Sequence, residues 1–245
     1  MITDLALGRL NDGLVTRFRR SDSWSVLRSL LILSQKYAAQ AIHTEAMFQL
    51  QLVFPTTLEQ WDARLDPPRV GAIHTIYDPK KDCISAAQTA RKLDLPILIS
   101  AALYDCCQLE ARELISGITH EDGHHDQLSP EDQMFCIRAR TRLLQLNHYL
   151  WNKVCKTTSR RCQTPMSCEA GRILLHARIN DPKEFDFYCV HSAVMSKSEW
   201  LETFLSGQGS CSLCIRAARR SHNEARRLFL ERIARRDFLA ENSAS

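Results

Sequence analysis

Two cysteine pairs constrain the fold of this chain more than any other feature of its sequence. Five residues separate Cys162 from Cys168, and two separate Cys211 from Cys214. Each pair lies where the flanking residues predict the start of a helix. Four cysteine thiolates are a common ligand set for a structural zinc ion, which binds its ligands in a tetrahedron. The sequence therefore predicts that two helix starts meet at one four-cysteine zinc site.

The cysteines also allow other interpretations. The five-residue spacing is longer than the two to four residues usual in zinc sites, and Cys155, Cys189 and His222 are reserve ligands. Four reduced thiols that bind no metal stay an open alternative. Cys211 and Cys214 could instead form a redox pair, because a helix N-terminus lowers the pKa of a thiol. That function usually follows a strand, whereas a predicted helix and the turn SGQGS precede Cys211.

Helix signals recur along the rest of the chain, and strand signals are nearly absent. Ser129 and Pro130, followed by two acidic residues, predict the start of a long helix. Asp82 is the expected N-cap of another helix. Further helices are predicted over residues 41–53, 82–93, 96–107, 165–178 and 210–234. We therefore expect an all-α fold: a single domain of roughly nine to ten helices, in which the four-cysteine zinc site would link two helix starts.

The domain boundaries follow from the same pattern. Helical signals fill residues 22–236, which are the predicted domain. Residues 1–21 are expected to be an irregular N-terminus, and residues 237–245 a disordered tail, because the tail is short and polar.

Composition excludes several classes of protein. The chain has 245 residues and a formal net charge of +4, which is weak for a nucleic-acid-binding protein. It has no apolar run of the ~20 residues that a membrane span needs, and its N-terminus lacks the pattern of a signal peptide. We therefore expect an intracellular protein of the cytoplasm or nucleus, without a membrane partner.

Catalytic motifs are also missing from the sequence. It contains no GxSxG, GxxxxGK[ST], GxGxxG or HExxH, and its eight glycines argue against loops that cradle phosphates. We therefore expect no enzymatic activity and no small-molecule substrate.

Five segments carry a resemblance to a known family. They are SLLILSQKYAAQAIHTEAMFQLQLVFPTTLEQWDAR, QTARKLDLPILISAALYDCC, GITHEDGHHDQLSPEDQ, SRRCQTPMSCEAGR and CSLCIRAARRSHNEARRLFLERI. In this order and spacing the chain resembles the helical region that follows the BTB core in fungal BTB/POZ domain-containing proteins. The resemblance covers most of residues 22–236. It implies a non-catalytic module for protein–protein interaction, with an unidentified protein partner.

The BTB core itself is not expected in this chain. That core needs roughly a hundred residues, the size of a small domain, whereas about twenty residues precede Asp22. Dimerisation and the recruitment of ubiquitin ligases belong to the core, so the resemblance does not imply them here.

Two local features suggest alternative functions. The predicted C-terminal helix is rich in arginine and could bind nucleic acid, although a docked helix with a solvated basic face is the favoured explanation. The segment THEDGHHDQL gathers His120, Asp122, His124, His125 and Asp126. These residues could bind a divalent cation or take part in acid–base chemistry, or they could form a plain polar loop.

Overall fold

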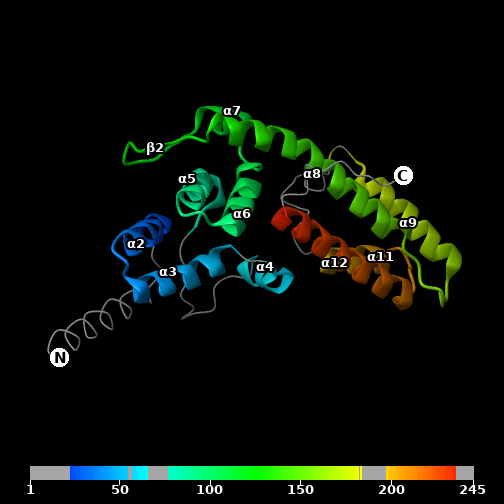
Figure 1. The fold of residues 1–245 in the computed structure, drawn as a ribbon. Coiled ribbons are helices and arrows are strands. Elements are labelled where there is room, and N and C mark those ends of the chain that lie inside the picture. The colour runs from blue at the N-terminus through cyan, green and yellow to red at the C-terminus, as the bar shows by residue number, and fades with distance from the viewer. Residues whose placement is uncertain (1–22, 55–56, 66–76, 182, 184–196, 236–245) are drawn as a thin grey trace, which may run out of the picture. The chain divides into compact units, whose positions relative to one another are not determined.

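The computed structural model describes residues 23–54, 57–65, 77–181, 183 and 197–235. Within these ranges the regular structure consists of ten α-helices and one two-stranded sheet (Figure 1). The prediction of an all-α fold is confirmed. Asp22 and both predicted terminal segments, residues 1–21 and 237–245, lie outside the described residues.

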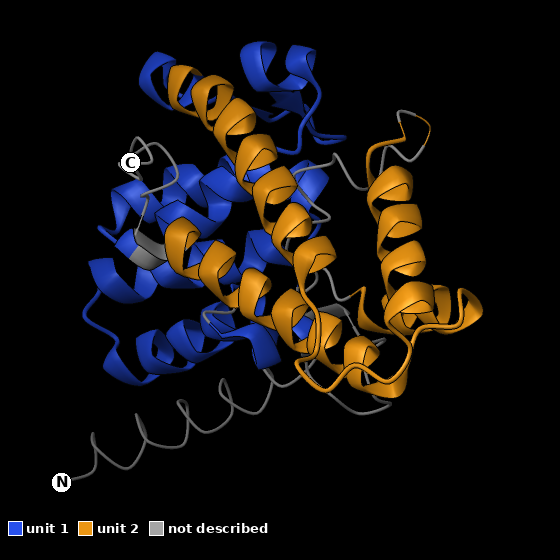
Figure 2. Cartoon of the chain, turned by 90° about the vertical axis from the view of Figure 1, so that its right-hand side faces the viewer, with its two compact units in different colours: residues 1–133 blue, residues 134–245 orange. Residues whose placement is uncertain are grey.

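The chain divides into two compact units, residues 1–133 and residues 134–245, where the sequence predicts one domain (Figure 2). The boundary falls inside the helix α8, Pro130–Lys156. A helix of 27 residues is about 40 Å long, more than one small core can cover, so a single helix serves both units.

Unit 1 contains six short helices before α8. They are α2 (Trp24–Lys36), α3 (Gln40–Val53), α4 (Leu58–Leu65), α5 (Pro79–Lys92), α6 (Pro96–Cys106) and α7 (Ala111–Ser116). Helices α2 and α3 pack against each other, as do α5 and α6. The start of α5 shows how a local sequence signal sets such a boundary.

Helix α5 begins one turn earlier than predicted. Asp78 is its N-cap, because the carboxylate of Asp78 accepts the backbone N–H of Lys80 at 2.9 Å and Pro79 occupies the first helical position. The prediction that Asp82 caps this helix is wrong. Asp82 lies in the first turn, where its carboxylate accepts the N–H of Asp78 at 2.8 Å.

Aromatic side chains build one part of the core of unit 1. The rings of Trp24, Phe54 and Tyr77 meet edge to face, with centroid separations of 4.8–6.0 Å. The indole N–H of Trp24 donates to the hydroxyl of Ser85 on α5 at 3.0 Å, so the buried polar atom of the tryptophan is satisfied. This bond joins the first described helix to α5.

A small β-hairpin occupies most of the segment that the sequence predicts as a polar loop. Strands β1 (Ile118–Thr119) and β2 (His125–Asp126) pair antiparallel. Gly117 precedes the hairpin at φ +84°, and its backbone passes so close to Asp126 that an added Cβ would lie 2.4 Å from the Asp126 carbonyl oxygen. Gly123, at φ +81°, turns the chain in open space.

We predict that Gly117→Ala destabilises unit 1 more than Gly123→Ala does. Both changes force a side chain into the left-handed region, at a cost of about 1–2 kcal/mol. Only Gly117→Ala adds a steric clash, which brings its expected cost to about 3 kcal/mol or more. Urea denaturation of the two variants measures the difference, and equal losses of stability would contradict the close approach of Gly117 to Asp126.

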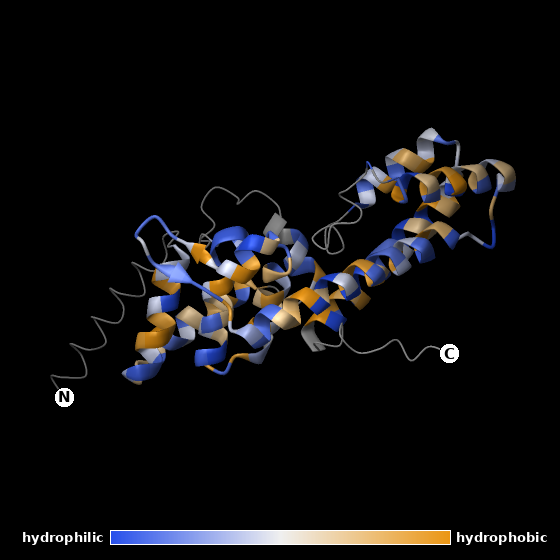
Figure 3. Ribbon diagram, turned by 90° about the horizontal axis from the view of Figure 1, so that it is seen from above, coloured by the Kyte–Doolittle hydropathy of each residue, from blue (hydrophilic) through white to orange (hydrophobic). Residues whose placement is uncertain are grey.

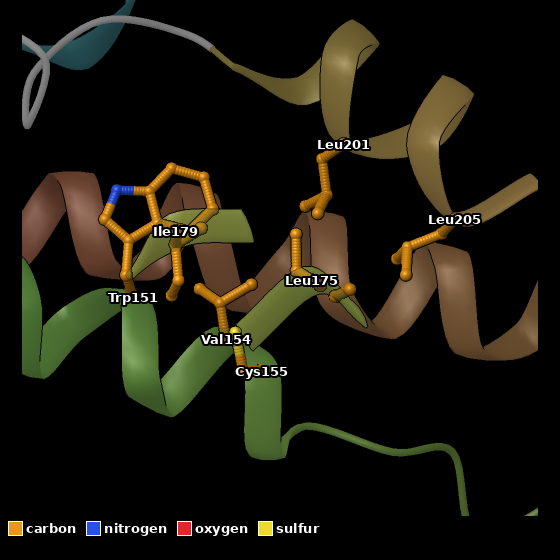
Figure 4. Packing of buried hydrophobic residues seen from close by; sticks show 8 residues of the cluster. Trp151, Val154, Cys155, Leu175, Ile179, Leu201 and Leu205 are labelled. Atoms are coloured by element: carbon orange, nitrogen blue, oxygen red, sulfur yellow. The ribbon is translucent and has the colours of Figure 1, made fainter. Parts of the chain in front are cut away.

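Unit 2 contains most of α8 and the helices α9 (Pro165–Ile179), α11 (Ser198–Gly207) and α12 (Ser212–Arg235). Each helix carries both hydrophobic and hydrophilic residues (Figure 3). Buried side chains from these four helices form the core of unit 2, and Figure 4 shows side chains of this cluster pointing toward one another. The core residues are Trp151, Val154, Cys155, Leu175, Ile179, Leu201, Leu205 and Ala218. The predicted starts at residues 165 and 210 agree with α9 and α12 to within two residues.

In the part of the chain that the structure describes, no helix has both the length and the apolar character to cross a bilayer.

Candidate metal centre

The four predicted ligands lie together in unit 2. The sulfur atoms of Cys162, Cys168, Cys211 and Cys214 are all within 4.8 Å of one another, and those of Cys162 and Cys211 are 4.0 Å apart. Four sulfurs at 2.3 Å from a tetrahedral zinc ion would be about 3.8 Å apart. The four thiols therefore need only a small contraction to bind one zinc ion.

The starts of two helices position these sulfurs. Cys168 lies in the first turn of α9, Cys214 lies in the first turn of α12, and Cys211 immediately precedes α12. Cys162 comes from the segment between α8 and α9. The positive end of a helix dipole stabilises the negative charge of a thiolate, so both helix starts favour a bound metal.

Gly171 lets α9 come close to the segment before α12. A Cβ at this position would lie 2.6 Å from the hydroxyl oxygen of Ser210. Cys168 precedes Gly171 by one helical turn, and Cys211 follows Ser210 directly. The absence of a side chain at Gly171 therefore helps to bring the two cysteines together.

Backbone N–H groups point at the sulfurs. The N–H of Cys211 donates to the sulfur of Cys168 at 3.2 Å, and the N–H of Gln163 donates to the sulfur of Cys211. The bond from Gln163 is the main cause that lowers the pKa of Cys211 to about 6. Hydrogen bonds to coordinating sulfurs orient them and stabilise their charge, as expected around a metal centre.

Burial acts to raise the pKa of the thiols next to Cys211. Burial raises the pKa of Cys214 to about 12, although the N–H of Ser159 acts in the opposite direction. Burial also acts to raise the pKa of Cys168, but hydrogen bonds from the Thr164 hydroxyl and the Cys211 N–H lower it overall. The cluster thus places the Cys211 thiolate beside the Cys214 thiol at neutral pH.

We predict that zinc binding releases protons and strengthens as the pH rises. At neutral pH Cys211 is already a thiolate, whereas Cys214, and Cys162 whose pKa burial also raises, are thiols. Binding should therefore displace about two protons or more, and the affinity should rise with pH. Calorimetric titration with zinc in buffers of different ionisation enthalpy counts these protons, and a heat that is independent of the buffer would contradict the prediction.

The three reserve ligands are not part of the four-cysteine cluster. Cys155 belongs to the apolar core of unit 2, where burial raises its pKa to about 12. The ring of His222 packs against Trp151, with their centroids 4.9 Å apart. Cys189 lies outside the described residues. The ligand set that the structure assembles is therefore the four-cysteine set.

The sequence alone does not identify the groups that surround the sulfurs. The Thr164 hydroxyl lies 3.3 Å from the sulfur of Cys168, and the N–H groups of Ser159 and Gln163 donate to other sulfurs. Backbone donors have no side-chain signature. The only available signal was their closeness in sequence to Cys162.

The arrangement suits a structural metal better than a catalytic one. A catalytic zinc keeps a coordination position for water or substrate, whereas four protein thiolates close the tetrahedron. Three of the four cysteines are buried, and Cys162 is half-buried. A metal held here would tie α9, α12 and the segment before α9 together.

Comparison of the chain with protein-family models, with curated proteins and with solved structures finds no match. The resemblance to fungal BTB/POZ proteins therefore stays a prediction from the sequence.

Proposed function

We propose that the chain is a zinc-stabilised helical module that binds another protein and catalyses no reaction. The observation that carries this proposal is the closed four-cysteine cluster between α9 and α12. Such a site stabilises a small core without offering a reactive position. A module of this kind acts through the surface that its helices present.

Helix α9 offers a suitable surface. Met166 and Ile173, which are 82% and 63% exposed, lie seven residues apart and so on the same side of the helix. Beside Ile173 is an open depression of about 310 Å³, lined by Cys155, Lys156, Glu169, Arg172, Ile173 and His176. Lys156 and Arg172 outnumber Glu169 in this lining, so the depression carries net positive charge beside the apolar side chain of Ile173. The partner segment it fits has apolar side chains next to carboxylates.

The test is affinity purification from the native cells with matched surface variants. Ile173→Glu should lose the partner, because it places a negative charge on the binding surface. Leu228→Glu, on the exposed side of α12, should retain it. The proposal is wrong if the unmodified chain recovers no specific partner, or if both variants retain it equally.

Nucleic-acid binding is a second candidate, favoured by exposed arginines on α12. Arg216, Arg220 and Arg227 lie on one exposed side of this helix, whereas Arg226 is buried and Arg219 forms an ion pair with Glu202 at 2.6 Å. Binding through phosphates should weaken steeply with salt. Absence of binding to DNA and RNA at low salt would end this candidate.

Thiol chemistry is the third candidate, and the low pKa of Cys211, about 6, is the feature that favours it. The clustering of two further thiols around Cys211 and Cys214 favours metal binding instead. Thiol–disulfide exchange between the reduced chain and glutathione disulfide distinguishes metal binding from redox chemistry. A zinc-loaded cluster should react slowly, whereas a redox pair should react rapidly.

A further inference from the structure

Two histidines of the hairpin in unit 1 converge on one buried carboxylate. His120 Nε2 lies 2.8 Å from one oxygen of Asp126, and His124 Nε2 lies 3.1 Å from the other. Asp126 is 2% exposed, whereas the side chains of His120 and His124 are 24% and 53% exposed. Solvent can therefore reach both imidazoles, and the carboxylate lies behind them.

Each histidine nitrogen lies about as far from the Asp126 carboxylate as two ligands of one metal ion lie from each other. Two ligand atoms at about 2.1 Å from one zinc ion, at angles of 90–110°, are about 3.0–3.4 Å apart. The two observed nitrogen–oxygen separations are within a few tenths of an ångström of this range. An ion bound to both imidazoles and to the carboxylate would replace the two hydrogen bonds and draw together the two rings, whose centroids are 6.1 Å apart.

We propose that His120, His124 and Asp126 form a second site for a divalent transition-metal ion such as Zn²⁺. Imidazole nitrogens and a carboxylate are a suitable ligand set for this ion. Three protein ligands leave at least one coordination position for water. The site is independent of the four-cysteine cluster and of the proposed binding function.

The fold holds the three ligands in place. Asp126 is in β2 and pairs with Ile118 of β1, while His120 and His124 flank the turn, where the N–H of His120 donates to the carbonyl of His124 at 2.8 Å. The half-buried carboxylate of Asp82 is near enough to His120 to interact with it electrostatically. This second negative charge favours a cation at the site.

His125 provides a matched control. It is in the same hairpin, but its Nδ1 lies 3.0 Å from the hydroxyl of Thr119 and not beside Asp126. His124→Gln is a second useful variant, because its amide can still donate a hydrogen bond to Asp126 while it is a far weaker metal ligand. Loss of metal binding in this variant cannot be attributed to a lost hydrogen bond.

The experiment is titration of the metal-free full chain with Co²⁺, followed by zinc competition. Cobalt bound by thiolates gives intense near-ultraviolet charge-transfer bands, whereas cobalt bound by nitrogen and oxygen gives only weak visible bands. The chain should show both signatures, with about two ions per chain. His120→Ala and His124→Gln should lose the weak bands and weaken zinc binding at that site at least about tenfold, and His125→Ala should keep both.

The two sites can fail separately because their spectra differ. A chain that binds cobalt only with the thiolate signature would overturn the hairpin site and leave the four-cysteine site standing. Weak bands that persist in both His120→Ala and His124→Gln would overturn it as well. Circular dichroism of each variant checks that the helices of unit 1 remain folded.

Discussion

Removal of zinc by a strong chelator is expected to unfold unit 2 and to leave the helices of unit 1 folded. Structural zinc binding contributes about 10–16 kcal/mol in small domains, as much as the whole stability of a typical domain. The cysteines hold the starts of α9 and α12, so both helices should lose their protection against amide hydrogen exchange. Helices α5 and α6 should keep theirs, and added zinc should restore the protection.

Variants of Cys162 separate metal binding from side-chain packing. Cys162→Ser removes a ligand and should reproduce much of the effect of chelation, whereas Cys162→His supplies a different zinc ligand and should retain the metal. Cys162 is the most exposed of the four, so either side chain can be accommodated. If chelation leaves the exchange of α9 and α12 unchanged, the cluster is not a zinc staple.

Leu201→Ala is expected to lower the free energy of unfolding of unit 2 by about 2–5 kcal/mol. Leu201 is fully buried between α8, α9 and α12 in the core shown in Figure 4, so the truncation leaves a cavity that the packed helices cannot fill. Urea denaturation of the zinc-loaded chain, followed by tryptophan fluorescence, measures the loss; Trp151 and Trp200 report on unit 2, whereas Trp24 and Trp61 report on unit 1.

Leu174→Ala is the matched control for that experiment. Leu174 is in the same unit but is 47% exposed, so the same truncation should cost less than about 1 kcal/mol. Similar losses in the two variants would contradict the packing of Leu201 in the core.

The sequence predicted the helices well because their signals are local. Ser129 and Pro130 determine where α8 begins, and the hydroxyl of Ser129 accepts the N–H of Asp132 at 3.2 Å. The start of α5 was misplaced because Asp78 and Asp82 are both good caps, and only the position of Pro79 distinguishes them. Local signals therefore indicate that a helix exists more reliably than they indicate its first residue.

Features that join residues far apart in the sequence could be predicted only where the residues have distinctive chemistry. The four cysteines could be predicted as one site, although more than forty residues separate Cys168 from Cys211, because few residue types bind zinc. The hairpin could not, because its two-residue strands depend on the approach of Gly117 to Asp126. Neither residue carries a strand signal, and the polar residues between them are typical of a loop.

The position of the unit boundary makes the two halves of this protein hard to separate. Gln133 and Met134, on either side of the boundary, both lie in the first part of α8, and no loop intervenes. A protease that cut there would remove Ser129 and Pro130 from the rest of the helix and expose four new N–H groups without partners. Expression of residues 134–245 alone would carry the same cost, because α8 would begin without its cap and first turn.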